Sequence, residues 1–232
     1  MTSFVPVPTL DGAENFNAFV ARPAESPKAA IVVIQEIFGV NSGIKRKCEK
    51  LASQGYLAIA PDLFWKLKPG VELDPDIEGE FNEALDLMGK FDQGAGIEDI
   101  QAVINFVRES ENGIKVGCIG YCLGGRLAYM TAARTDIDAS IGYYGVGIDE
   151  LLDEKQSITT PLLLHIPTED GFVDKATQAA MHEGLDPHPH ATLYDYEGLD
   201  HGFATEFGQR RDDQAAELAD MRSSAFFEEH LA

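Results

Sequence analysis

One cysteine stands where its thiol could act as a nucleophile. The stretch Lys115–Gly125 reads K-V-G-C-I-G-Y-C-L-G-G and places Cys122 between Gly120 and Gly124. This G-x-C-x-G spacing is typical of a nucleophile elbow, a sharp strand-to-helix turn that usually carries serine. The glycines leave room for the neighbouring strand and helix, and free N–H groups at the helix N-terminus favour negative charge. The pattern predicts an exposed, reactive thiol; the alternative is a buried, inert cysteine.

An acid and a histidine follow Cys122 in the order that a hydrolytic triad on such an elbow requires. His201 would be the base that activates the thiol. Asp170 would orient His201 and stabilise its charged form. The alternatives for the acid are Glu169, Asp174 and Asp200. His165 lies inside a predicted strand and is expected in the core.

Backbone N–H groups are expected to bind the oxyanion that forms when the thiol attacks a carbonyl carbon. One belongs to Leu123, directly after the nucleophile, and the second to Ile37, in the loop after an apolar run. Glu36 ends that run facing the nucleophile, so its carboxylate would be partly desolvated. Glu36 is therefore a candidate base or hydrogen-bond partner for the thiol; the alternative is a solvated loop glutamate.

The three cysteines suggest a reducing compartment. Cys48, Cys118 and Cys122 are an odd number without metal-ligand spacing, which favours the cytoplasm. A redox pair of Cys118 with Cys122 is conceivable, but the first falls within a predicted strand and the second at the turn. Cys48 is expected on a charged helix face, without a role.

The acidic composition argues against nucleic acid as a partner. The chain of 232 residues has 39 Asp and Glu against 18 Lys and Arg, a formal net charge of -21, so phosphates would be repelled. No apolar run approaches the roughly 20 residues of a membrane span, and no basic-then-apolar leader opens the chain. The length predicts a single domain over residues 1–232.

Strands that alternate with helices must position these residues. The predicted strands are Phe4–Pro8, Asn15–Ala21, Ala29–Gln35, Tyr56–Ala60, Val116–Ile119, Ala139–Tyr144, Pro161–Ile166 and Ala191–Tyr196. The predicted helices are Gly43–Gln54, Glu78–Phe91, Ile97–Glu109, Gly125–Ala133, Lys175–Glu183 and Asp213–His230. This alternation predicts an α/β fold, a mostly parallel sheet with helices on both faces and a site at the carboxyl ends of the strands. Leu63–Pro75 has no clear period and is expected as a loop over a site or an irregular connection.

With these motifs the chain resembles the dienelactone hydrolase (carboxymethylenebutenolidase) family of the α/β-hydrolase fold. The resemblance rests on Q-E-I-F-G at Gln35–Gly39, G-Y-C-L-G-G at Gly120–Gly125, G-Y-Y-G-V-G at Gly142–Gly147, the Asp170 loop and D-H-G-F-A at Asp200–Ala204. It implies a triad of Cys122, His201 and Asp170. It also implies that Glu36 holds the resting thiol and helps to activate it once substrate binds.

The resemblance implies an activity as well. The family reaction opens an unsaturated lactone through an acyl-enzyme, from carboxymethylenebutenolide to maleylacetate, in the degradation of aromatic compounds. A carboxylic ester hydrolase of this kind is expected to need no metal or organic cofactor and to be a monomer. The expected substrate contacts are Tyr144, Phe38, Trp65, Phe81 and Thr205.

Two positions depart from the family pattern. Members hold the substrate carboxylate with two arginines, and Phe81 and Thr205 stand at those positions here, with Leu85 in place of a nearby tyrosine. Arg210 and Arg211 lie just downstream and could substitute, or be ordinary surface residues. A carboxylesterase or thioesterase for neutral acyl esters is therefore the second hypothesis. A non-hydrolytic binding protein or thiol sensor on the same fold is the third.

Overall fold

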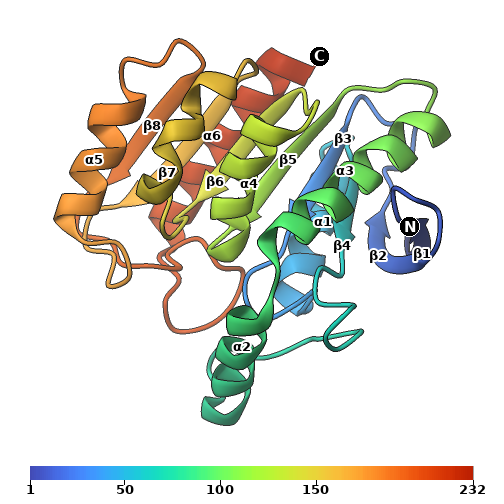
Figure 1. Ribbon diagram of the computed structural model, residues 1–232, viewed down its shortest axis with the longest axis horizontal. Helices are drawn as coiled ribbons and strands as arrows, with labels where there is room; N and C mark the ends of the chain where they lie inside the picture. The colour runs from blue at the N-terminus through green and yellow to red at the C-terminus, as the bar shows by residue number, and fades with distance from the viewer. Residues whose placement is uncertain (232) are drawn as a thin grey trace. The chain divides into compact units, whose positions relative to one another are not determined.

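The computed structural model describes residues 1–231 and divides the chain into two compact units. Met1–Gly117 forms the N-terminal unit, and the part from Cys118 onward forms the C-terminal unit (Figure 1). All eight predicted strands and six predicted helices are present in the described residues. None of those helices has the length and apolar character that a membrane span requires. The single domain stays a prediction.

The N-terminal unit contains four strands in the order β1-β2-β4-β3. They are β1 (Thr2–Pro8), β2 (Asn15–Ala21), β3 (Ala30–Ile34) and β4 (Leu57–Pro61), with helices α1 (Ser42–Ser53), α2 (Glu78–Lys90) and α3 (Gln93–Ser110). The first two strands form the predicted antiparallel hairpin, and β3 pairs with β4 in parallel. In the hairpin turn, the Asp11 carboxylate accepts hydrogen bonds from the Thr9 hydroxyl and the Ala13 N–H, and Gly12 supplies a φ of 70°.

The predicted irregular segment after β4 is a packed loop. The Asp62 carboxylate accepts hydrogen bonds from the N–H groups of Phe64 at 3.1 Å and Gly70 at 2.7 Å. A Cβ atom at Gly39 would lie 2.0 Å from the Val71 carbonyl oxygen, so only glycine allows the loop to approach there. Side-chain bonds to the backbone thus replace regular structure in this loop.

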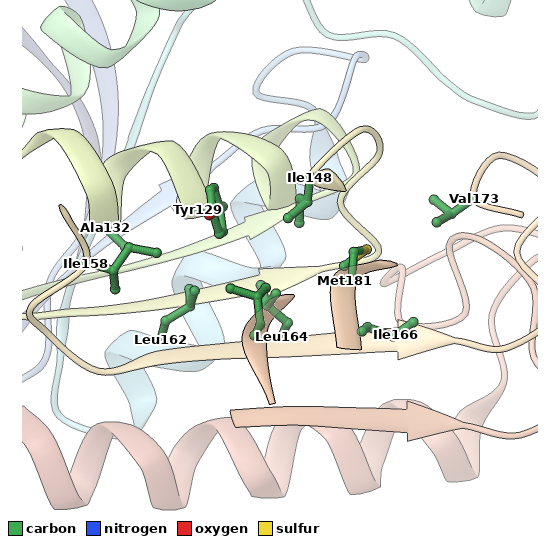
Figure 2. Close-up of a cluster of buried hydrophobic side chains, with 10 residues drawn as sticks. Tyr129, Ala132, Ile148, Ile158, Leu162, Leu164, Ile166, Val173 and Met181 are labelled. Carbon is green, nitrogen blue, oxygen red and sulfur yellow. The ribbon is translucent and has the colours of Figure 1, made fainter. Parts of the chain in front are cut away.

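The C-terminal unit contains strands in the order β5-β6-β7-β8, and β6, β7 and β8 pair in parallel. These strands are β5 (Val116–Tyr121), β6 (Ala139–Tyr143), β7 (Leu162–Pro167) and β8 (Ala191–Tyr196). Each is followed by a helix, in order α4 (Leu123–Arg134), the 3-10 helix η1 (Asp149–Ser157), α5 (Lys175–Leu185) and α6 (Asp213–Leu231). Helices α4 and α5 cover one face of the strands and α6 covers the other (Figures 1 and 2). Only η1 was not predicted from the sequence.

Alternating residues of β7 separate the two faces of this unit. Leu162, Leu164 and Ile166 point into an apolar cluster with Tyr129 of α4 and Met181 of α5 (Figure 2). The intervening residues point toward α6, as expected from the two-residue period of a strand. Full burial of each aliphatic side chain stabilises the folded state by about 1.5–3 kcal/mol. This cluster therefore fixes the ends of the strands from which the site loops extend.

Candidate active site

Cys122 lies at the tip of a strained turn between β5 and α4. Its φ of 55° and ψ of -115° lie in a region that non-glycine residues rarely occupy. Its N–H donates a hydrogen bond to the Tyr143 carbonyl at 3.1 Å, and its carbonyl accepts from the Gly125 N–H at 2.9 Å. Leu123 opens α4, so its N–H is among the first four, which lack a partner inside the helix. Cys122 is half-buried, neither fully exposed as the pattern predicts nor enclosed like the other two cysteines.

Two glycines make this turn possible. A Cβ atom at Gly120 would lie 1.9 Å from the Gly124 carbonyl oxygen. A Cβ atom at Gly125 would lie 2.3 Å from the carbonyl oxygen of Tyr143. Because backbone atoms cannot move aside as a side chain can, any larger residue would force strand and helix apart.

The loops after β7 and β8 bring an acid and a histidine together. His201 Nδ1 lies 2.9 Å from Asp170 Oδ2, and both residues are buried. Asp170 Oδ1 also accepts a hydrogen bond from the Phe172 N–H at 2.8 Å, which fixes the carboxylate. The Cys122 side chain lies close enough to His201 to raise the pKa of its ring. The C-terminal unit therefore brings the Asp170–His201 pair near Cys122.

The environment of His201 favours its charged form. Burial lowers the pKa of the ring, but the hydrogen bonds with Asp170 and Cys122 outweigh burial and raise the pKa of His201 to about 10. The thiolate is the reactive form of cysteine, and a neighbouring imidazole can hold the proton that the thiol gives up. The arrangement can thus supply an activated nucleophile and, in the same ring, a proton for a leaving group.

The other acidic residues of the two loops contact groups other than the His201 ring. Asp200 accepts hydrogen bonds from backbone N–H groups, including that of His201 at 2.7 Å. Asp174 caps the N-terminus of α5. Glu169 is exposed and forms an ion pair with a lysine. Among the described residues, only Asp170 contacts the His201 ring with a carboxylate.

The two remaining cysteines are buried thiols. Cys118 is 0% exposed, its S–H donates to the Ser140 hydroxyl at 3.3 Å, and burial raises the pKa of Cys118 to about 12. The prediction of a charged face for Cys48 was wrong: Cys48 is also 0% exposed, because it follows the buried Ile44 by one helical turn. All three cysteines are free, so the structure contains no disulfide between Cys118 and Cys122.

Aromatic side chains surround His201. The Tyr144 ring meets the His201 ring edge-to-face with centroids 4.9 Å apart, and Phe203 lies 5.8 Å from Tyr144. Phe172 also meets His201 at 4.9 Å and is 53% exposed. The sequence analysis did not single out Phe172, although its place two residues after Asp170 could have indicated it. These rings shield the His201–Asp170 pair from water on two sides.

The two downstream arginines differ in what they contact. The Arg210 guanidinium carbon lies over the Phe172 ring at 5.6 Å, and the exposed group makes no hydrogen bond or ion pair with residues 1–231. Arg211 donates to the Thr205 carbonyl at 2.6 Å and to the Asp213 carboxylate at 2.7 Å. The Thr205 hydroxyl is buried without a hydrogen-bond partner among the described residues. Arg211 is thus a structural residue, whereas the exposed Arg210 faces the Asp200 carboxylate, whose pKa its positive charge helps to lower.

Four predicted site residues lie in the N-terminal unit near the end of β3 and on α2. Glu36 is half-buried and Ile37 is buried, both directly after β3. The rings of Phe38 and Phe81 are 5.9 Å apart, so the structure brings this pair together. The roles of these residues toward Cys122 stay predictions.

Trp65 is held by its own neighbours in the N-terminal unit. Its indole N–H donates to the Asp99 carboxylate at 2.8 Å, and its ring stacks on Phe16 at 5.8 Å. These contacts anchor the loop after β4. A substrate contact of Trp65 stays a prediction.

Comparisons with known proteins identify relatives along the whole chain. The model of the dienelactone hydrolase family matches residues 16–231. A carboxymethylenebutenolidase of Pseudomonas putida is 37% identical over 97% of this chain and 96% of that protein, and a candidate carboxymethylenebutenolidase of Azospirillum brasilense is 40% identical over 98% of each. The crystal structure of a candidate dienelactone hydrolase from Klebsiella pneumoniae superposes with a TM-score of 0.87 at 27% identity, over 99% of both chains. The predicted α/β-hydrolase fold is confirmed by this match.

Proposed function

The chain belongs to the dienelactone hydrolase family and is a carboxylic ester hydrolase, and on that premise we propose that it opens a lactone or small ester through an acyl-enzyme on Cys122. The observation that carries the proposal is the buried His201–Asp170 pair, bonded at 2.9 Å and close enough to the strained Cys122 turn for Cys122 to raise the pKa of His201. The names of the relatives suggest carboxymethylenebutenolide as substrate, and the family resemblance implies maleylacetate as product.

In the first half of the proposed reaction, the Cys122 thiolate attacks the acyl carbon. A C–S bond forms while the carbonyl electron pair moves to oxygen, and the Leu123 N–H stabilises that oxyanion. As the tetrahedral adduct collapses, the C–O bond to the leaving oxygen breaks and the His201 imidazolium protonates this oxygen. In a lactone the leaving oxygen stays attached to the acyl group, so the ring opens.

Water then hydrolyses the thioester. Neutral His201 takes a proton from the attacking water, whose oxygen forms the new C–O bond. The C–S bond breaks and returns the thiolate beside the imidazolium. Asp170 keeps Nδ1 protonated and directs the other ring nitrogen toward the reacting atoms throughout.

We expect Cys122→Ala to lower the turnover of both a dienelactone and p-nitrophenyl acetate by about 10³-fold or more, because the covalent route is lost. Steady-state kinetics of wild type and variant measure this. Cys118→Ala, which removes a buried thiol from the same segment, is the matched control and should keep wild-type turnover. Wild-type turnover by Cys122→Ala would rule out the acyl-enzyme.

The position of Arg210 supports an anionic substrate. Its guanidinium is held on Phe172, whose ring contacts His201, so a substrate carboxylate could pair with it near the reacting bond. The second candidate, a neutral acyl ester, is favoured by Phe81. Its ring packs on Phe38 at a position where the family resemblance leads us to expect an arginine.

The two substrate classes are separated by Arg210→Gln. If the substrate is anionic, the KM of this variant for the dienelactone should be about tenfold higher, since a charge-assisted hydrogen bond is lost. Its KM for p-nitrophenyl acetate should equal that of wild type. Arg134→Gln, which removes the same charge at the far end of α4, is the control. Equal kinetics of Arg210→Gln and wild type on the dienelactone would favour the neutral substrate.

We further propose that the enzyme works in the cytoplasm as a monomer. All three cysteines are free thiols, and Cys122 needs a reducing compartment to stay reactive. Light scattering during gel filtration measures the oligomeric state.

A further inference from the structure

A chain of buried polar side chains crosses the C-terminal unit, and the reaction proposed above uses none of them. Tyr143, His165 and Ser223 are exposed by 0%, 1% and 3%. They come from β6, β7 and α6, three separate elements. Burial of polar groups costs free energy unless they are hydrogen-bonded, and each of these is bonded to the next.

One assignment of hydrogens satisfies every link. In it, the Tyr143 hydroxyl donates to Asp220 Oδ1 at 3.4 Å. Since a hydroxyl has one hydrogen, Ser223 then donates the 2.7 Å bond to the Tyr143 oxygen. Ser223 Oγ then accepts from His165 Nε2 at 2.9 Å.

The same reasoning assigns the proton of His165. With its hydrogen on Nε2, the neutral ring accepts at Nδ1, and the Tyr196 hydroxyl donates to it at 2.7 Å. The Arg222 guanidinium carbon lies over the Tyr196 ring, 5.3 Å from its centroid. The chain therefore runs from the Tyr196 hydroxyl to the carboxylate of Asp220 on α6, and each bond polarises the next.

Tyr143, near one end of this chain, contacts the nucleophile turn through its backbone. The carbonyl of Tyr143 accepts the N–H of Cys122 at 3.1 Å, and the carbonyl of His165 accepts the N–H of Tyr144 at 2.9 Å. The strand ends that the chain joins thus support both the nucleophile turn and the tyrosine packed on His201.

The other end reaches the loops of the acid and the histidine. Tyr196 is the last residue of β8, and its ring packs on Phe203 at 4.7 Å, two residues beyond His201. Its carbonyl accepts the N–H of Thr168 at 3.0 Å, two residues before Asp170. The buried polar chain therefore contacts the segments that hold Cys122, Asp170 and His201.

We propose that this buried chain positions the proposed triad, and that His165 is its central positioning residue. Apolar packing tolerates small slides between strands, whereas a directional chain of hydrogen bonds accepts one arrangement of the three strand ends. A shift of about 1 Å at a reacting atom can lower the rate about 10²-fold. The inference rests on the proposed function, because its readout is the chemistry of Cys122.

The test compares His165→Leu with His165→Gln. Leucine makes neither bond, while the glutamine amide can donate to Ser223 and accept from Tyr196. Below the unfolding temperature, we expect His165→Leu to lower kcat on p-nitrophenyl acetate at least about tenfold with little change in KM. Alkylation of Cys122 by iodoacetamide should slow in parallel. His165→Gln should recover both rates to within about threefold of wild type.

Leu185→Ala is the control for stability alone, since Leu185 is buried in the apolar cluster of the same unit and lies outside the polar chain. It should lower Tm and keep kcat. If His165→Leu does not fold, Ser223→Ala and Tyr196→Phe, which remove one hydroxyl each, take its place. A folded variant with wild-type kcat and alkylation rate, or equal losses in the leucine and glutamine variants, would overturn the inference. Failure of the proposed function itself would show separately, as turnover that survives Cys122→Ala.

Discussion

The chemistry of the site depends on one proton held among three side chains. Asp170 and Cys122 both draw this proton onto His201, and they do so strongly enough to overcome the effect of burial on the ring. The raised pKa of His201 favours the imidazolium form, which is the form that the proposed reaction uses to protonate the leaving oxygen.

The pH profile of kcat/KM on p-nitrophenyl acetate should report this proton. Because the free-enzyme pKa of His201 is raised to about 10, activity should fall as the pH rises through that value and the proton donor is lost. Asp170→Asn removes a hydrogen bond that raises the pKa, so the alkaline limb should move to lower pH. We also expect kcat to fall by about 10²-fold or more. Asp174→Asn, the same change at the cap of α5, should leave the limb in place; an unmoved limb in Asp170→Asn would contradict this assignment of the proton.

At the scale of elements, the elbow depends on how closely its strand and helix can approach each other. The strand β5, the turn and the helix α4 fit only because Gly120 and Gly125, which precede and follow Cys122 in the elbow, lack a Cβ atom. The positive φ of Cys122 is held by the hydrogen bonds of its own N–H and carbonyl, which tie the turn to β6 and α4. The local strain is therefore maintained by contacts of neighbouring elements.

Two glycine substitutions should have opposite effects on stability. Gly120→Ala places a Cβ atom 1.9 Å from a backbone oxygen and should lower the free energy of unfolding by about 3 kcal/mol or more. Gly89→Ala, in α2 with nothing within 4 Å, should raise it by about 0.5–1 kcal/mol, because alanine favours the helix. Urea denaturation measures both. Similar midpoints for the two variants would mean that the close approach at Gly120 is not a constraint.

The local pattern predicted the elements well, and the exceptions have physical reasons. Glycines at the ends of elements and apolar residues spaced by two or 3.6 positions are local features of the sequence. The β1–β2 hairpin and the six helices were therefore predictable from them. The 3-10 helix η1 has no buried residue and hence no apolar period to detect. Cys48 was misplaced because flanking charges concealed the buried stripe of α1 that it shares with Ile44.

At the scale of the whole molecule, charge is the dominant feature. A formal net charge of -21 means that folding brings many carboxylates together without enough cations to pair them. Such self-repulsion destabilises a compact state, and salt screens it. The surface ion pairs contribute little each, so their weakening by salt should not reverse the effect.

Added salt should therefore stabilise the protein at neutral pH. We expect Tm at pH 7 to rise by a few degrees between about 0.02 and 0.2 M NaCl, over which the Debye length shortens to about 10 Å or less. Near pH 4.5, the pI that the composition predicts, the net charge vanishes and the salt effect should vanish with it. Differential scanning calorimetry at both pH values is the measurement, and a fall of Tm with salt at pH 7 would show that attractive ion pairs dominate instead.

The sequence by itself determined the nucleophile turn, the order of thiol, acid and histidine, and the alternation of strands with helices. These follow from backbone sterics and periodicity, which act between residues close together in the chain. Only the tertiary structure decided that Asp170, rather than Asp200, reaches the His201 ring. It likewise separated Arg210 from Arg211. Such distances depend on how strands pair and where their loops return, and no local pattern encodes them.

The buried histidine shows the same division. From its strand context, His165 was predicted to be a core residue, and the structure places it there at 1% exposure. What the sequence could not reveal are its two partners, Ser223 and Tyr196, which lie 58 and 31 residues away. Hydrogen bonds over such separations form only when the sheet and α6 have packed, because strand pairing and helix docking bring their atoms within reach.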